Sequence, residues 1–369
     1  MRLGVAEREW ITQRAVAAGF DLAGVADVPE DAAEDDARFA GFVEAGFAGE
    51  MEYLKRVDDA GEYVRGDLRR SMPWARSVVV CAVNYNVEAP LSIEPADAKA
   101  GWIARYAWSG REDGGGSDYH DVLLAQLRAV EAEIRERFAE CETRCYVDTG
   151  PIVERGFAAR AGVGWIGKNT CVLNQQQGSW LLLGVIVTSL ELAGEALSVA
   201  AADRCGSCTR CIDACPTDAL IGERQMDASR CIAYLTIEKK GSIEESLRAL
   251  IGRQVFGCDI CQDVCPWNRK APIATLEALP ARAELVNPAL EWLASLDGAE
   301  FNRVFRGSPL ERTRRKRVLR NVAIAMGNSG CADFLGQLDV WAGGEDVVLA
   351  EVAGWAAARL RGEAGSLRE

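Results

Sequence analysis

The sequence contains a single histidine among its 369 residues, and long apolar runs are equally scarce. Hydrolysis by a serine–histidine–aspartate triad would have to use His120, yet no nucleophile motif accompanies it. The first ten residues, MRLGVAEREW, lack the apolar stretch of a signal peptide. The longest apolar run, near residues 180–190, is shorter than the roughly 20 residues that span a bilayer. We therefore expect a soluble cytoplasmic protein without a membrane partner.

Positive charge is also in short supply. The formal net charge is −13, which argues against a surface that binds nucleic acid throughout. The total conceals a local exception, because residues 303–320 hold eight Arg or Lys residues and one Glu. Such a segment is either a solvated helix face or a contact surface for RNA phosphates, and the residues alone leave both interpretations open.

Composition divides the chain into three predicted domains. Residues 1–200 are expected to form an α/β domain, since apolar strand-like segments alternate there with a long amphipathic stretch. Residues 201–270 are crowded with cysteine and poor in apolar runs, as small iron–sulfur modules are. Residues 271–369 are rich in Ala, Leu and Arg and are expected to be helical, with paired helices of the HEAT kind.

Local patterns support these assignments. A helical stripe of apolar residues runs through 119–140, and Ser117 or Asp118 could cap its start. Two helical segments, 318–330 and 347–360, suggest related helix pairs, although two units are too few to establish a repeat. Continuous or β-branched apolar runs predict three buried strands, at 77–83, 143–147 and 179–188.

Cysteine, in contrast, is abundant, with 13 in the chain. Without a secretory signal we expect reduced thiols rather than disulfides, and closely spaced thiols then indicate a metal site. The run CGSCTRCIDACP (205–216) has the spacing of bacterial ferredoxins, and FGCDICQDVCP (256–266) repeats its Cys-Pro ending. A single zinc ion would need only four ligands and would leave the second run unexplained. The pair therefore predicts two 4Fe–4S clusters.

The second run has one cysteine too few, because Val255 stands where its first ligand is expected. In two-cluster ferredoxins the last cysteine of each run binds the other cluster. This rule predicts that the first cluster is bound by Cys205, Cys208, Cys211 and Cys265. It leaves the second with Cys215, Cys258, Cys261 and an open position, which we assign to Cys231, the only other cysteine of the module. The alternative is a three-cysteine cluster with an open iron. Among the remaining cysteines, Cys171 adjoins a glycine-rich loop.

Three further motifs have competing explanations. The segment GVGWIGKNT (162–170) resembles a dinucleotide or phosphate loop, but a helical pattern precedes it and an extended one follows, the reverse of the required order. Its glycines could still let the backbone approach another large ligand. His120 is at a helix start, where a structural hydrogen bond is the common role. Asp148 follows a predicted strand, where it could cap a turn or donate a proton.

Together, several motifs resemble epoxyqueuosine reductases in sequence and in order, over residues of about 50 to 330. Besides the two cysteine runs they are RYA (105–107), DYH (118–120), DTGPIVER (148–155), GWIGKN (164–169) and CIAYLTIE (231–238). One departure is the link WSGREDGGGS between RYA and DYH, which is several residues longer than is usual in that family.

The resemblance implies a cobalamin-dependent oxidoreductase that converts epoxyqueuosine to queuosine at the wobble base of tRNA, with loss of the epoxide oxygen as water. It implies that cobalamin lies between the N-terminal domain and the ferredoxin-like module, and that an external donor supplies electrons singly through the clusters. The reduced cobalt would attack an epoxide carbon while an acid protonates the oxygen. We expect the enzyme to be a monomer.

Site residues carried over by resemblance are as follows. Asp148 matches the proton donor of the family. Cobalamin contacts are expected from Arg65, Trp108, Asp148, Gly167, Lys168 and Asn169. Contacts with tRNA phosphates are expected from Lys240, Arg312, Arg314, Arg315, Lys316, Arg317 and Arg320.

Two other functions remain as alternatives to the tRNA reductase. One is a related cobalamin reductase of a small molecule, similar to reductive dehalogenases. The other is an electron carrier without catalytic activity. The basic C-terminal segment favours a nucleic-acid substrate, and a carrier would not need the large α/β domain.

Overall fold

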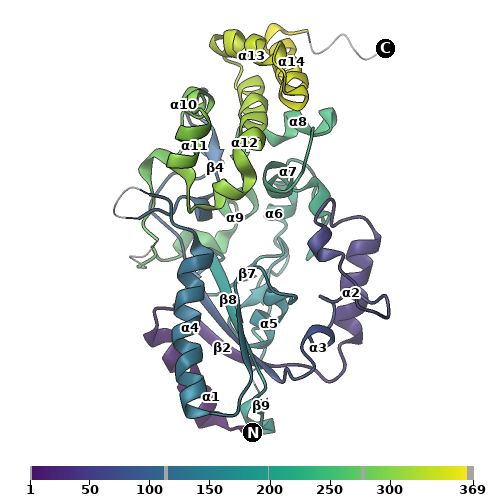
Figure 1. Cartoon of the computed structure of the whole chain (residues 1–369), viewed down its shortest axis with the longest axis vertical. Coiled ribbons are helices and arrows are strands. Elements are labelled where there is room, and N and C mark those ends of the chain that lie inside the picture. Colours follow the sequence, from purple (N-terminus) through teal and green to yellow (C-terminus); the bar gives the residue numbers. More distant parts are fainter. Residues whose placement is uncertain (1, 112–114, 198, 276–278, 364–369) are drawn as a thin grey trace.

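The computed structural model describes residues 2–111, 115–197, 199–275 and 279–363. Figure 1 shows an elongated molecule, with the α/β part at the N-terminal end and stacked helices at the C-terminal end. Among the described residues, no helix is long and apolar enough to cross a membrane.

A four-stranded antiparallel sheet is the centre of the α/β part. Its order is β2 (Leu22–Asp27), β3 (Ser77–Asn84), β8 (Leu181–Thr188) and β5 (Thr143–Tyr146). The three predicted strands are therefore confirmed. Every residue of β3 is buried, because both faces of the sheet are covered. Successive side chains of a strand point to opposite faces, and Val79 and Cys81 accordingly belong to one core while Val78 and Val80 belong to the other.

Helices cover the two faces of this sheet. On one side lie α1 (Val5–Ala17) and α4 (Tyr119–Arg137), and on the other lies α5 (Glu154–Arg160) (Figure 1). The predicted stripe on α4 is confirmed, since Leu123, Leu127, Val130 and Ile134 are all fully buried. Asp118 caps this helix by accepting a hydrogen bond from the His120 amide.

Shorter elements complete the α/β part. They are α2 (Ala33–Glu44), α3 (Leu68–Ser71), the pair β1 (Arg2–Leu3) and β9 (Glu191–Leu192), and the hairpin β6 (Trp165–Ile166) and β7 (Val172–Leu173). Among the residues that the structure describes, the 3-10 helices are η1 (Glu52–Leu54), η2 (Arg105–Ala107), η3 (Gly194–Ala196), η4 (Ala228–Arg230), η5 (Pro266–Lys270), η6 (Ala283–Leu285) and η7 (Ala332–Phe334). In the long 108–117 link, Gly110 and Gly116 form an isolated bridge, and residues 112–114 lie outside the described residues.

The cysteine-rich module contains short elements only. They are α6 (Arg210–Asp213), β10 (Leu220–Gly222), β11 (Gln225–Met226), α7 (Ile232–Ile237), α8 (Glu245–Ile251), β12 (Gln254–Phe256) and α9 (Ile260–Asp263). Between Cys231 and Cys258 the chain forms two short helices, α7 and α8, before β12. Gly241 and Gly252, both with positive φ, bound the segment that contains α8.

The C-terminal part is helical, as predicted. It consists of α10 (Leu290–Ser295), α11 (Gly298–Phe305), α12 (Pro309–Asn328), α13 (Leu335–Ala342) and α14 (Val347–Arg361). Helix α12 is interrupted at Arg314, whose φ is 61°. Its later part is buried on most sides, because α14 packs on it from one direction and α7 and β12 from another.

Packing crosses the boundaries drawn from composition. Strand β4 (Trp102–Ile103), from the N-terminal segment, pairs in parallel with β12 of the cysteine-rich module. One hydrophobic core contains residues of β4, α7, β12 and α12 together. The predicted division at residue 270 therefore separates two compositions but not two hydrophobic cores.

Candidate active site and metal-binding thiols

Asp148 lies in the turn that follows β5, and its backbone has a left-handed φ of 56°. Few residues other than glycine adopt this conformation, although aspartate and asparagine tolerate it best. The side chain is 53% exposed and accepts a hydrogen bond from the Tyr119 hydroxyl. The His120 Nε2 atom lies 3.7 Å from the same carboxylate oxygen. Two neighbouring residues at the start of α4 therefore hold Asp148 in an uncommon conformation.

His120 forms a charged cluster with Asp118 and Arg312. Its Nδ1 atom is 2.7 Å from Asp118 Oδ1 and 2.8 Å from a guanidinium nitrogen of Arg312, which also pairs with Asp118. Arginine cannot accept a hydrogen bond and a carboxylate cannot donate one, so Nδ1 can serve only one of them. Burial opposes ionisation of Asp118, but the hydrogen bonds from His120 and the charge of Arg312 lower its pKa overall. His120 thus has a hydrogen-bonding partner, as expected of a lone histidine at a helix start.

Tyrosines line the surroundings of Asp148. Burial, reinforced by the negative charge of Asp148, raises the pKa of Tyr106 and Tyr119 well above the ordinary value. Burial and the charges of Glu238 and Asp148 raise the pKa of Tyr53 to about 12, and Arg65 lies over the Tyr53 ring at 5.9 Å. These phenols stay protonated at neutral pH and can act as hydrogen-bond donors. Arg65 and Asp148 therefore both act on Tyr53, and the predicted contact of Arg65 with cobalamin stays a prediction.

Glu154, at the start of α5, was not singled out from the sequence. It is 9% exposed, and burial together with the charge of Asp148 raises its pKa to about 7. Its Oε1 atom has no hydrogen-bond partner among the described residues. The available signal was its place in DTGPIVER, six positions after Asp148 and at the first position of the next helix.

The glycine-rich segment forms the β6–β7 hairpin, so neither phosphate-loop motif is present. A Cβ atom on Gly164 would lie 2.3 Å from the Leu173 carbonyl oxygen, and one on Gly167 would lie 1.9 Å from a Leu173 methyl group. The two glycines are thus required by the hairpin itself. Lys168 is buried, with its Nζ atom 2.6 Å from Glu223. Asn169 donates a hydrogen bond to the Cys261 carbonyl oxygen at 3.3 Å, which ties the hairpin to the cysteine-rich module.

The cysteines of the two runs gather in two sets. Within the first set Cys211 and Cys265 both interact electrostatically with Cys205, and Trp165 Nε1 lies 3.4 Å from the Cys205 sulfur. Cys211 also interacts with Cys208, and Cys265 with Cys211, so the first set comprises Cys205, Cys208, Cys211 and Cys265. The second set is linked in the same way and comprises Cys215, Cys231, Cys258 and Cys261. Cys231 thus interacts with cysteines of the second set, and the binding of two clusters by these sets stays a prediction.

Two details refine this arrangement. Val255, at the position of the missing cysteine, is completely buried in β12 and faces the hydrophobic core. The Cys171 thiol hydrogen-bonds to Cys261, so a fifth sulfur adjoins the second set. Across the described parts of the chain, no three Cys, His, Asp or Glu side chains converge as they would around one metal ion.

Two expected contact residues are buried. Trp108 is 1% exposed, and its indole N–H donates to the Ile103 carbonyl oxygen, so it has no surface to offer cobalamin. Arg320 is also 1% exposed, and its guanidinium donates to the carbonyl oxygens of Leu235, Lys239 and Gly241. It cannot reach a tRNA phosphate. Both predictions are corrected here, because the sequence motif and the charge run did not reveal which side of the chain faces the core.

The other residues predicted to contact tRNA differ in whether their charged groups already bind another group of the protein. Arg315 and Arg317 direct their guanidinium groups at carbonyl oxygens of Leu296 and Ile237. Arg312 is half-exposed and is paired with Asp118. The exposed residues are Arg314, Lys240 and Lys316, of which Lys316 also pairs with Asp346.

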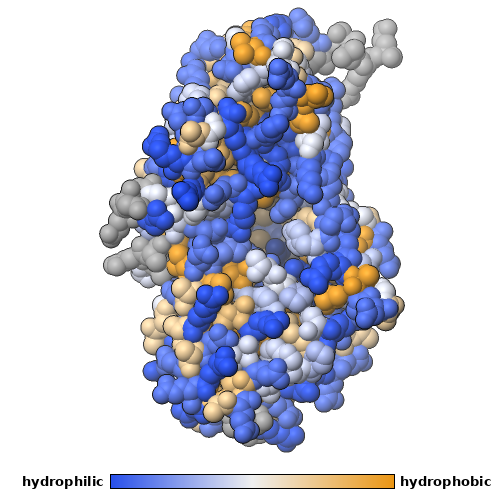
Figure 2. All heavy atoms as spheres, viewed as in Figure 1, coloured by the Kyte–Doolittle hydropathy of each residue, from blue (hydrophilic) through white to orange (hydrophobic). Residues whose placement is uncertain are grey.

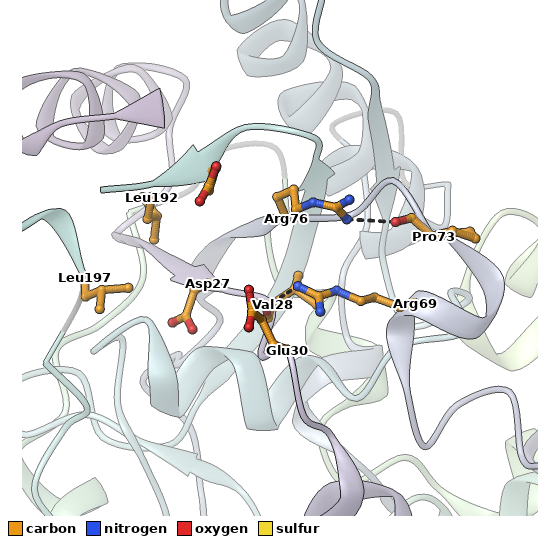
Figure 3. Close-up of a pocket in the computed structure, with 9 residues that line it drawn as sticks. Asp27, Val28, Glu30, Arg69, Pro73, Arg76, Leu192 and Leu197 are labelled. Atoms are coloured by element: carbon orange, nitrogen blue, oxygen red, sulfur yellow. Dashed lines mark hydrogen bonds between the residues drawn. The ribbon is translucent and has the colours of Figure 1, made fainter. Parts of the chain in front are cut away.

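The space-filling view shows a hollow near the middle of one face, where Figure 1 places β7 below and α7 above (Figure 2). A separate cavity of about 460 Å³ lies at the far end of the sheet, beside Asp27, Arg69, Arg76 and Leu192 (Figure 3). Figure 3 shows Arg69 directed at the Val28 carbonyl oxygen, to which it donates a hydrogen bond. None of the residues that line this cavity belongs to the Asp148 cluster, so we place the candidate site elsewhere.

Comparisons with known proteins now bear on this site. Residues 65–149 match the family described as "Epoxyqueuosine reductase QueG, DUF1730", and residues 204–268 match "4Fe-4S double cluster binding domain". The epoxyqueuosine reductase of Xanthomonas campestris is 36% identical over 347 residues, 93% of each chain. The chain belongs to the epoxyqueuosine reductase family. The Escherichia coli epoxyqueuosine reductase is 32% identical over 350 residues, which cover 95% of this chain and 88% of that protein.

Solved epoxyqueuosine reductases have the same fold. A selenomethionine-labelled crystal structure superposes with a TM-score of 0.83 at 28% identity, over 95% of this chain and 90% of that one. Another, at a TM-score of 0.83 and 27% identity, contains an epoxyqueuosine-modified tRNA stem loop and matches 95% of this chain and 89% of its own. The predictions of an epoxyqueuosine reductase, and hence of an oxidoreductase with a two-cluster module, are confirmed. The residue assignments and the cobalamin contacts stay predictions.

Proposed function

We propose that this chain reduces epoxyqueuosine to queuosine in tRNA, with cobalamin and two 4Fe–4S clusters as cofactors and Asp148 as the proton donor. The observation that carries the proposal is the position of Asp148. It is half-exposed, accepts a hydrogen bond from Tyr119, and lies 3.7 Å from His120, which in turn contacts Arg312 of α12. Burial and the charge of Asp148 raise the pKa of Tyr106, whose ring packs against Phe256 of the cysteine-rich module. We infer that the acid, the electron route and the phosphate-binding surface meet near Asp148.

The residues around the hollow fit a large redox cofactor. A corrin ring needs a wide opening and hydrogen-bond donors at its edge, and Figure 2 shows a hollow between the two parts of the molecule. Arg65 and the hairpin residues Gly167, Lys168 and Asn169 would hold its periphery. Lys168 is engaged by Glu223, so its contribution is expected from the backbone. The bond from Asn169 to Cys261 would place the cofactor next to the second cluster.

When bound, cobalamin supplies a strongly reducing cobalt centre that receives electrons singly from the clusters. The chain itself would manage the proton and the substrate. Asp148 would protonate the epoxide oxygen as its carbon–oxygen bond breaks, and the Tyr119 hydroxyl would orient the Asp148 carboxyl group. The tyrosines around Asp148 would exclude water from the reacting bond.

The first cluster would be bound by Cys205, Cys208, Cys211 and Cys265, and the second by Cys215, Cys231, Cys258 and Cys261. Lys240, Arg312, Arg314 and Lys316 would contact RNA phosphates, because their charged groups reach the surface beside the site. An external reductant would supply the electrons. The cytoplasmic location, the monomeric state and the HEAT-like character of the C-terminal helices stay predictions.

The direct test is mass spectrometry of nucleosides from epoxyqueuosine-containing tRNA after incubation with the enzyme, cobalamin and a chemical reductant. Conversion to queuosine is expected only when both clusters and cobalamin are present. Persistence of epoxyqueuosine with a fully loaded enzyme would refute the proposal. Absorbance spectra of the purified protein, before and after addition of cobalamin, check the loading independently.

A further inference from the structure

The two cysteine runs differ in how far they reach into solvent. In the first run, the residues between the first three cysteines, at 206–207 and 209–210, are all exposed. In the second run, Asp259, Gln262 and Asp263 are buried. A protein in solution can therefore approach the loop of the first set much more closely than that of the second.

Four exposed cations lie next to cysteines of the first set, two of them in its loop and two in η5, which follows Cys265. They are Arg204, Arg210, Arg269 and Lys270, which we call the basic rim. Within the described part of the chain, no carboxylate pairs with any of the four. The protein as a whole has a net charge of −13, so the basic rim reverses the sign of the charge locally.

Packing brings the two halves of the basic rim to one place. The Trp165 Nε1 atom lies 3.4 Å from the Cys205 sulfur, and the Trp165 ring packs edge-on against Trp267 with 5.2 Å between centroids. Trp267 belongs to η5 and precedes Arg269 by two positions. Helix α6, which begins at Arg210, also packs against α9, which leads into η5. The four cations therefore border a single patch of surface.

Two carboxylates in the same segments do not cancel this charge. Asp203 forms an ion pair with Arg224 and accepts a hydrogen bond from the Cys205 amide. Asp213 accepts a hydrogen bond from the Thr209 hydroxyl group. Because Arg224 offsets the charge of Asp203, only Asp213 opposes the four cations.

We propose that the basic rim is the docking surface for an acidic protein that carries single electrons. This inference rests on the proposed function, which requires an external reductant but does not say where it binds. Transient redox complexes have small interfaces, below about 1,200 Å², so complementary charge largely sets how fast the partners associate. In each encounter the partner would lose one electron and the first cluster would gain it, and two encounters would supply the electrons for one epoxide.

RNA is the other class of molecule that a basic surface attracts. The proposed phosphate contacts centre on Arg312 and Arg314 of α12, beside Asp118 and His120. The basic rim instead belongs to the segments that carry the cysteines of the first set, where a partner would come close to the first cluster. We therefore favour the electron carrier, and tRNA affinity is measured as part of the test.

Stopped-flow reduction of the clusters, followed through their visible absorbance, tests this surface without tRNA or cobalamin. The probe is a reduced flavodoxin of acidic charge, and the comparison is photoreduced deazariboflavin, a small neutral reductant. Opposite charges speed association by about 10- to 10³-fold at low ionic strength, so Arg204→Glu/Arg269→Glu should react with flavodoxin at least about tenfold more slowly. Its reduction by deazariboflavin should stay within about twofold of wild type, because a neutral molecule is not steered by charge. Arg135→Glu, on the exposed side of α4, is the matched control and should behave as wild type with both reductants.

Added salt should slow the reaction of the wild type with flavodoxin and have little effect on the charge-reversed variant. A wild-type rate that does not depend on salt, or a variant that reacts with flavodoxin as fast as wild type, would overturn the inference. If Arg204→Glu lowers the iron content, Arg269→Glu/Lys270→Glu decides, because it leaves the cysteine loop unchanged. Weaker tRNA binding without slower cluster reduction would assign the basic rim to RNA and overturn the inference as well. Failure of the wild type to make queuosine would refute the proposed function, whereas the docking surface is decided by cluster reduction alone.

Discussion

Replacement of Asp148 by Asn would separate proton donation from every other property of the site. Asparagine tolerates the left-handed φ of 56° as well as aspartate does, so the turn after β5 should keep its shape. The amide oxygen can still accept the hydrogen bond from Tyr119. The side chain is about half-exposed, so the change should alter the free energy of unfolding by about 0.5 kcal/mol or less. What the variant lacks is the transferable proton.

A positioned general acid contributes about 10²- to 10⁴-fold to a rate, so a loss of that size in single-turnover queuosine formation is expected. Iron content, cobalamin binding and tRNA affinity should remain those of the wild type. Asp148→Ala is a poorer test, because alanine in a left-handed conformation adds about 1–2 kcal/mol of backbone strain. Tyr119→Phe should lose less activity than Asp148→Asn, since it removes only the orienting hydrogen bond. Activity of Asp148→Asn within threefold of wild type would refute the assignment of Asp148 as the acid.

Four further predictions concern the clusters, the basic segment and acid stability. Cys231→Ala should reduce bound iron from about eight to about four atoms per chain, whereas Cys331→Ala should not, and equal iron in both would restore the open-iron alternative. Arg320→Ala should lower the free energy of unfolding by about 3 kcal/mol, because it removes a buried side chain and leaves the carbonyl oxygens of Leu235, Lys239 and Gly241 without their donor, and urea denaturation measures this. Lys316→Ala should leave stability unchanged and reduce the slope of tRNA affinity against salt by about one, and an unchanged slope would remove it from the phosphate contacts. Arg70 on α3 donates a hydrogen bond to Asp36 and lowers the pKa of that carboxyl group. The stabilisation from this pair should therefore be present near neutral pH and be lost as pH falls below about 4. Asp36→Asn should therefore be less stable than wild type at pH 7, and the difference should shrink at pH 3; a constant difference would contradict this.

The sequence predicted the parts of this protein that rest on local pattern. Strand β3 is an apolar run with both faces covered, and the stripe on α4 repeats at helical spacing, so periodicity sufficed for both. The spacing of Cys205, Cys208 and Cys211 is equally local. The assignment of Cys231 to the second cluster came from counting cysteines and stays a prediction; Cys215 is among the groups that act on the Cys231 pKa.

The errors concern which way a side chain faces, which depends on distant segments. Arg320 belongs to a run of arginines that looks like one charged surface, but α7 lies against that side of α12 and its carbonyl groups bind the guanidinium. Trp108 follows a motif shared with the family, yet it packs in a core made largely by residues beyond 230. Glu154 was missed because burial gives it its unusual acidity, and burial is not visible in one glutamate of a short helix.

The pairing of β4 with β12 also constrains how the protein is assembled. Trp102, Ile103 and Trp108 leave the ribosome long before the strand and helices against which they pack. At synthesis rates of about 5–20 residues per second, these apolar side chains wait on the order of ten seconds for their partners. The cysteines of the second set are likewise drawn from chain regions that meet only after β12 has formed. Iron insertion is thus expected to follow synthesis of the C-terminal helices, and truncated chains that end near residue 200 should aggregate rather than yield an isolated α/β domain.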